Sequence, residues 1–90
     1  MAWEIAWTHQ AWRDLERLDP PVARRVVRKL EQAAAAADPP RRFARLRGHD
    51  DRKLRIGDYR LLALLSADTA TILVLRVAHR SRVYREKQGR

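Results

Sequence analysis

The sequence predicts an α+β fold in which a two-helix N-terminal hairpin packs on a four-stranded antiparallel sheet. Apolar residues recur with helical spacing in the first half of the chain, after a short opening strand, and at alternate positions in the second half. A chain of 90 residues is expected to form one domain, residues 1–90. Helices followed by a strand meander are expected to cover one face of the sheet.

The chain opens with three large apolar residues at alternate positions, Trp3, Ile5 and Trp7. This alternation predicts a strand with one apolar face. Thr8 is then placed to cap a short helix through its side-chain oxygen. The apolar side of this helix is expected to carry Ala11, Leu15 and Leu18. Its polar side is expected to carry Arg13, Asp14, Glu16 and Arg17.

Asp19-Pro20-Pro21 ends the first helix and begins the second, with Asp19 as the cap and Pro20 at the first helical position. The second helix is expected to run to Ala37, before Asp38-Pro39-Pro40. Its apolar stripe consists of Val22, Val26, Val27, Leu30, Ala33, Ala34 and Ala37. The tight break between the helices predicts an antiparallel hairpin.

The second half predicts three strands, at residues 52–56, 59–65 and 71–79. Gly57-Asp58 separates the first two and is typical of a tight hairpin turn. Residues 66–70 are expected to form a five-residue loop before the last strand. The polar tail from Ser81 to Arg90 has room for one short helix at most.

Charge gives the first indication of function. The chain carries 20 Lys and Arg against 11 Asp and Glu, a formal net charge of +9. Arg dominates this excess, and a guanidinium binds phosphate with two parallel hydrogen bonds. A polyanionic partner, most simply nucleic acid, is therefore expected. The alternative is an Arg-rich solvated surface without a ligand.

Several chemistries are excluded or disfavoured. The chain has no Cys, so it has no disulfide, thiol nucleophile or Cys-ligated zinc. No His, Asp or Glu grouping has metal-ligand spacing and no Gly-rich phosphate loop occurs, so no metal or cofactor is expected. The first twelve residues do not form a signal peptide, and no apolar stretch is long enough to span a bilayer. A cytoplasmic protein without membrane contact is expected.

The predicted hairpin brings basic residues together on one sheet face. With a two-residue turn, Arg55 lies opposite Arg60 and Lys53 shares their face. The five-residue loop then places Leu65 opposite Thr71 and Arg76 opposite Arg60, with Arg80 further along the same face.

Like charges on neighbouring strands destabilise a sheet, and a bound phosphate would offset their repulsion. This favours an anion site. The alternative is that the basic side chains extend into solvent or pair with Asp50, Asp51 and Asp58.

The motifs together resemble those of the RelE/ParE toxin superfamily over nearly the whole chain. They are Leu46-Arg47-Gly48, the run from Lys53 to Leu62 that contains Gly57-Asp58-Tyr59-Arg60, Val77-Ala78-His79-Arg80, and Val83-Tyr84. The resemblance implies the RelE-like, microbial RNase-like toxin fold. It also implies a toxin of a type II toxin–antitoxin system. In the RelE branch such toxins are mRNA interferases, metal-independent endoribonucleases that cleave codons in the ribosomal A site by attack of the 2′-hydroxyl.

The resemblance assigns catalytic roles to Lys53, Arg60, Arg80 and Tyr84, and RNA-binding roles to Arg55, Arg76, His79 and Arg82. Tyr84 would activate or orient the 2′-hydroxyl, while Arg60 and Arg80 would hold the scissile phosphate. Lys53 would stabilise charge or act as a base, and His79 could share the acid or base role. One departure is Asp51, at a position where the RelE branch often has a second Lys.

The resemblance further implies a cognate acidic antitoxin, a toxin–antitoxin hetero-oligomer, and mRNA and the ribosome as partners. Two alternatives stay open. A ParE-type toxin has the same fold but poisons DNA gyrase, and it generally lacks the basic and tyrosine set. A non-catalytic RNA- or ribosome-binding module would use the basic face for binding alone, but it would be expected to expose strand aromatics.

Overall fold

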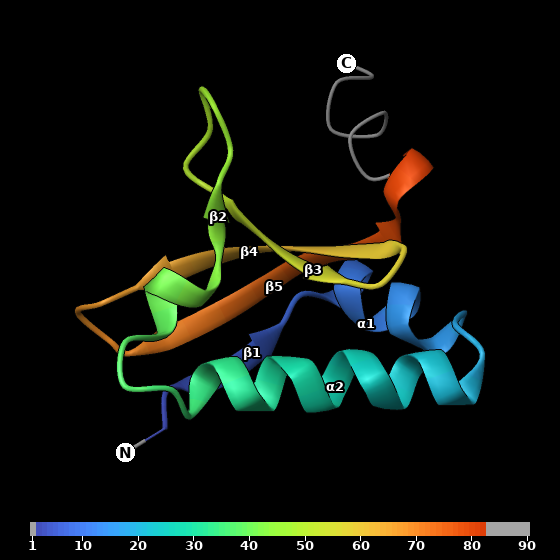
Figure 1. Cartoon of the computed structure of the whole chain (residues 1–90), viewed down its shortest axis with the longest axis horizontal. Helices are drawn as coiled ribbons and strands as arrows, with labels where there is room; N and C mark the ends of the chain where they lie inside the picture. The colour runs from blue at the N-terminus through green and yellow to red at the C-terminus, as the bar shows by residue number, and fades with distance from the viewer. Residues whose placement is uncertain (1, 83–90) are drawn as a thin grey trace.

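The structure is a computed structural model that describes residues 2–82 of the chain. Its elements follow in the order β1 (Glu4–Trp7), α1 (His9–Glu16), α2 (Pro20–Ala34), the 3₁₀ helix η1 (Pro39–Arg42), β2 (Ala44–Arg45), β3 (Arg52–Ile56), β4 (Tyr59–Ser66) and β5 (Thr71–His79). The strands form one sheet, and α1 and α2 cover one of its faces (Figure 1). The α+β class is confirmed. None of the described helices is long and apolar enough to cross a membrane.

The expected four-stranded antiparallel sheet is wrong in two respects. The sheet has five strands in the order β1-β5-β4-β3-β2, and β1 pairs with β5 in parallel, from Glu4 with Thr71 to Trp7 with Val74. Residues 8–70, which contain the helices and the other three strands, connect β1 to β5 and supply the long connection that a parallel pair requires. β2 is only two exposed residues long, too short to show an alternating pattern.

The helix ends follow local chemistry. The Thr8 hydroxyl oxygen accepts a hydrogen bond from the Ala11 N–H at 3.0 Å, which confirms the predicted cap of α1. α2 begins at Pro20 as predicted, but the Asp19 side chain makes no capping hydrogen bond. α2 ends at Ala34 rather than Ala37, and η1 is a further helical element beyond the predicted hairpin. The residue before a proline avoids helical geometry, and Asp38 accordingly has φ −139° and ψ 83°.

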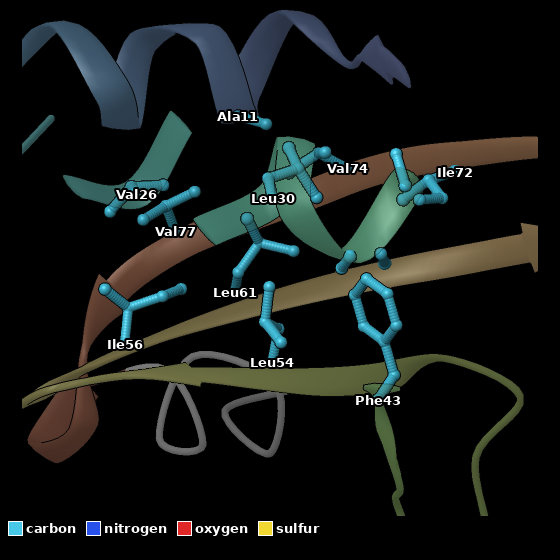
Figure 2. Close-up of a cluster of buried hydrophobic side chains, with 13 residues drawn as sticks. Ala11, Val26, Leu30, Phe43, Leu54, Ile56, Leu61, Ile72, Val74 and Val77 are labelled. Carbon is cyan, nitrogen blue, oxygen red and sulfur yellow. The ribbon is translucent and has the colours of Figure 1, made fainter. Parts of the chain in front are cut away.

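The hydrophobic core lies between the helices and the sheet (Figure 2). Leu30 of α2 and Leu61 of β4 are fully buried at its centre. Around them pack Val26, Leu54, Ile56, Ile72, Val74 and Val77. The three predicted apolar residues of the opening strand also pack against this cluster. The core therefore fixes which sheet face is covered and leaves the other for the basic residues.

The pairing of β4 with β5 differs from the expected register. Ser66 pairs with Thr71, so the loop has four residues, 67–70, instead of five. Ala70 closes it with a positive φ of 50°. A bulge follows, because Leu62 pairs with Arg76 while Ala63 pairs with Val74, which leaves Leu75 as the extra residue.

Candidate nucleic-acid interface

Three basic residues share the sheet face that points away from the helices, as predicted. Arg55 pairs with Arg60, and Lys53 pairs with Leu62, across β3 and β4. Their neighbours Leu54 and Leu61 are buried in the core, so side chains at the alternate positions emerge on the opposite face. We call Lys53, Arg55 and Arg60 the cationic row. Like charges in register are costly, so this arrangement suits an anionic ligand.

Arg60 is hydrogen-bonded to the turn that precedes it. It is 9% exposed, and its Nη1 donates hydrogen bonds to the carbonyls of Gly57 at 2.9 Å and Tyr59 at 3.0 Å. A guanidinium has five N–H donors, so Nε and Nη2 keep their donors for a further acceptor. The turn Gly57-Asp58 thus orients a charged fork whose remaining donors can take a phosphate.

The predicted bounds of the last strand, 71–79, are confirmed, but Arg80 does not continue its face as expected. β5 ends at His79, and Arg80 begins a helical turn. Its backbone N–H donates to the Asp58 carbonyl at 2.8 Å, and the residue is exposed. This hydrogen bond holds Arg80 next to the Gly57-Asp58 turn, which directly precedes Tyr59 and Arg60. The predicted nearness of Arg80 to the row is therefore supported by the backbone, although the strand itself has ended.

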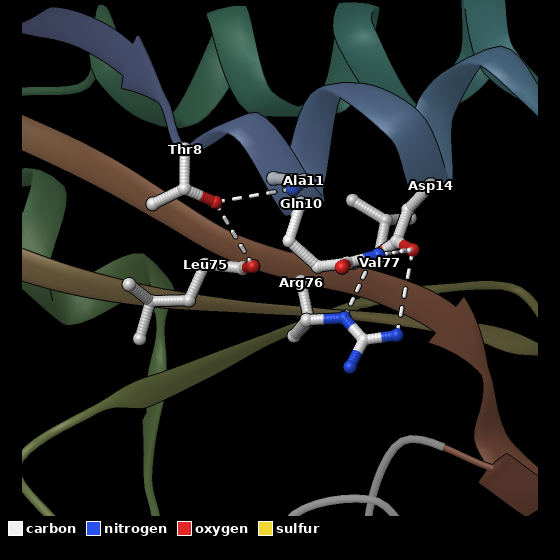
Figure 3. A network of polar contacts seen from close by, with 7 residues as sticks. All are labelled: Thr8, Gln10, Ala11, Asp14, Leu75, Arg76 and Val77. Carbon is white, nitrogen blue, oxygen red and sulfur yellow. Dashed lines mark hydrogen bonds and ion pairs between the residues drawn. The ribbon is translucent and has the colours of Figure 1, made fainter.

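Arg76 lies opposite Leu62 and not opposite Arg60, whose partner is Ala78. The shorter loop and the bulge each shift the register by one residue, so together they keep Arg76 on the predicted face but move it two positions along. Its side chain then turns to the edge of the sheet, where Nε lies 2.8 Å from Asp14 Oδ2 (Figure 3). Arg76 is thus a partner of α1 instead of a member of the row.

Asp14 was expected on the polar side of α1, and this prediction is wrong. The residue is 6% exposed. Its carboxylate accepts hydrogen bonds from the Val77 backbone N–H at 2.9 Å and from Gln10 Nε2 at 3.1 Å, besides the contact with Arg76 (Figure 3). The sequence held a signal for this, because Asp14 lies three residues after Ala11 and four before Leu18, on the apolar stripe itself.

His79 faces the helices and not the cationic row. It pairs with Tyr59 across the sheet, and the two rings meet edge to face with centroids 5.5 Å apart. Its Nδ1 accepts the Ser81 backbone N–H at 3.2 Å and lies 2.9 Å from Ser81 Oγ. A backbone N–H can only donate, so the proton of the neutral imidazole lies on Nε2. His79 therefore acts as the cap of the turn that begins at Arg80.

The remaining predicted residues divide by position. Arg55 and Arg82 are exposed, and Lys53 is half-buried. Tyr84 lies outside the described residues, so its role stays a prediction.

Asp51 is 4% exposed directly before β3, so this acidic residue belongs to the buried part of the fold. Within residues 2–82 no three His, Cys, Asp or Glu side chains are grouped as a metal site would require.

Comparison with solved structures defines the class of the fold. The chain resembles RelBE2 of Mycobacterium tuberculosis, a toxin–antitoxin complex, with 28% identity and a TM-score of 0.74 over 88% of this chain and 99% of that one. An E. coli RelE variant in complex with a RelB antitoxin peptide matches with 26% identity and a TM-score of 0.70, over 97% and 95%. The RelE–RelB complex of Pyrococcus horikoshii matches in fold, with 23% identity and a TM-score of 0.74, over 92% and 100%.

The family follows from the sequence itself. Residues 5–84 match the family model described as the ParE toxin of the type II toxin–antitoxin system parDE. The chain belongs to this family, and it is a type II toxin of the RelE/ParE superfamily. A comparison with curated protein sequences finds no match.

Proposed function

We propose that this toxin is a ribosome-dependent mRNA endoribonuclease. The observation that carries the proposal is the cationic row on the sheet face away from the helices, together with the hydrogen bond from the Arg80 N–H to Asp58 in the turn before Arg60. Cationic side chains beside a hydrogen-bonded guanidinium could hold a phosphate and stabilise the charge that develops during phosphodiester cleavage. The M. tuberculosis and E. coli structures, both above 25% identity, come from the RelE branch.

The chemistry needs no metal. The 2′-hydroxyl attacks the adjacent phosphorus, the bond to the 5′-oxygen breaks, and a 2′,3′-cyclic phosphate and a 5′-hydroxyl result. Arg60 and Arg80 would hold the phosphate and stabilise the charge that gathers on its oxygens. Tyr84 would orient or deprotonate the 2′-hydroxyl, with Lys53 beside it. The ribosome would supply the in-line alignment of the mRNA.

The same proposal includes an antitoxin. Because the toxin has a net charge of +9, an acidic segment of the antitoxin would be attracted to it and would fold over the toxin as it binds. The M. tuberculosis and P. horikoshii structures are toxin–antitoxin complexes. We therefore place this chain in a cytoplasmic toxin–antitoxin hetero-oligomer that releases the toxin onto ribosomes.

Primer extension on a reporter mRNA in purified translation complexes tests the activity. The wild type should cut within A-site codons only when ribosomes are present. Arg60→Ala should lower the cleavage rate by about 10²–10³-fold, as expected for loss of a group that stabilises transition-state charge. Arg28→Ala, on the exposed side of α2, removes the same charge away from the row and should cleave at close to the wild-type rate.

A second candidate function is poisoning of DNA gyrase, which the match to the ParE family model favours. A supercoiling assay with purified gyrase separates the two. Inhibition of supercoiling together with an intact reporter mRNA would reject the endoribonuclease and support the gyrase poison. Ribosome-dependent cuts with unaffected supercoiling would support the endoribonuclease and reject the gyrase poison.

A further inference from the structure

A cavity of about 450 Å³ lies where the end of α1 meets the end of β5. Its walls include Arg17 and Leu18 just after α1, Tyr59 at the start of β4, and His79, Ser81 and Arg82 at the end of β5 and beyond. We propose that this end cavity binds one nucleotide of single-stranded RNA beside the scissile phosphate. The inference rests on the proposed function, because it extends the cationic row into a longer RNA path.

The charges in the cavity favour an anion. Its one carboxylate, among the described lining residues, is that of Asp14. This carboxylate is already engaged by Arg76, Gln10 and the Val77 N–H. No ion pair involves Arg17 or Arg82 within residues 2–82. Arg17 and Arg82 therefore line the cavity without a described acidic partner to neutralise them, which suits a phosphate.

The aromatic wall favours a nucleobase over inorganic phosphate. Tyr59 and His79 meet edge to face with an interplanar angle of 83°, so the two rings do not stack on each other. A half-buried Tyr ring is a surface on which an unpaired base stacks. The His79 Nε2–H is left to donate, because Nδ1 accepts from Ser81. A base edge offers acceptors of the matching kind.

The size and place of the cavity fit the same ligand. Ligand pockets range over roughly 300–1,000 Å³, and this one lies in that range. Tyr59 and Arg60 are consecutive in β4, so their side chains leave opposite faces of the sheet at the same end. An RNA strand that passes round this end would place one nucleotide in the cavity and the next phosphate at the row.

The test uses the full chain and a trinucleotide RNA whose 2′-hydroxyls are methylated, so that it binds without being cleaved. Its Kd is measured by calorimetry at about 0.1 M salt, where long-range charge effects are screened. Arg17→Ala and Tyr59→Leu should each raise the Kd about tenfold. Arg42→Ala, an exposed residue of η1, is the matched charge control and should change it less than about twofold.

Circular dichroism of each variant separates loss of fold from loss of binding, and the exposed Arg17 provides the variant that should not disturb folding. Equal Kd values for Arg17→Ala and Arg42→Ala would overturn the inference. So would Arg17-dependent binding of a short poly-glutamate peptide without binding of the trinucleotide, since the cavity would then serve a protein partner. Failure of mRNA cleavage would reject the proposed function alone, because the binding assay requires no cleavage.

Discussion

At the scale of single residues, the most informative side chain is Asp14. The outer edge of β5 is covered by β1 only from Thr71 to Val74. Beyond that point the Val77 N–H needs another acceptor, and Asp14 supplies it at 2.9 Å while also holding Arg76. A buried carboxylate is tolerated because a cation and several donors satisfy it.

Asp14→Asn should therefore destabilise the protein by about 1–3 kcal/mol, because the amide keeps one acceptor but loses the charge that pairs with Arg76. Urea denaturation at neutral pH measures this loss. Glu16→Gln, an exposed charge removal on the same helix, is the control. If the free energies of unfolding of the two variants differed by less than about 0.5 kcal/mol, the Asp14–Arg76 pair would contribute no more to stability than an ordinary surface contact.

At the scale of elements, Thr8 joins α1 to the sheet. Its hydroxyl oxygen accepts the Ala11 N–H and its hydroxyl donates to the Leu75 carbonyl at 3.2 Å. Its backbone N–H donates to the Val74 carbonyl at 3.0 Å. One residue thus starts the helix and continues the hydrogen bonding of the sheet edge, next to the bulge at Leu75.

Thr8→Ala should reduce the free energy of unfolding by about 1–2 kcal/mol, since it removes both the cap and the bond to Leu75. Asp19→Ala makes the matched change at the cap of α2, where no side-chain hydrogen bond forms, and should cost less. Thermal denaturation of the two variants side by side compares the caps. A larger loss for Asp19→Ala would contradict this account of the helix ends.

The β3–β4 hairpin shows why part of the site was predictable. Gly57-Asp58 sets a short local turn, and the pairing of Arg55 with Arg60 follows directly from it. The position of Arg76 depends on a loop and on a bulge that no local pattern encodes, and its final partner comes from a helix 62 residues away in sequence. The predicted register of β3 with β4 was therefore correct, whereas the predicted register of β4 with β5 was displaced.

At the scale of the whole molecule, one thin core supports both the helices and the cationic row. Leu30 and Leu61 are fully buried where α2 meets the sheet. Proteins have a net free energy of unfolding of only about 5–15 kcal/mol, so one substitution that leaves a void in such a core removes a large share of this stability. The rigid platform under Arg55 and Arg60 depends on this packing.

Leu30→Ala should destabilise the protein by about 2–5 kcal/mol through lost burial and an unfilled cavity. Leu64→Ala is the control, because Leu64 is 39% exposed and its removal leaves no internal void. Urea denaturation midpoints measure both. Comparable losses would mean that the uncovered sheet face contributes as much packing as the core does.

The sequence by itself determined the identity of most elements and the faces on which their side chains lie. Alternation placed Trp3, Ile5 and Trp7 inward and the cationic row outward, because a two-residue period is a local property of extended chain. Only the tertiary structure decided that β1 runs parallel to β5, that Asp14 is buried, and that Arg76 leaves the row. These depend on contacts between distant segments, whose free energies no short stretch of sequence contains.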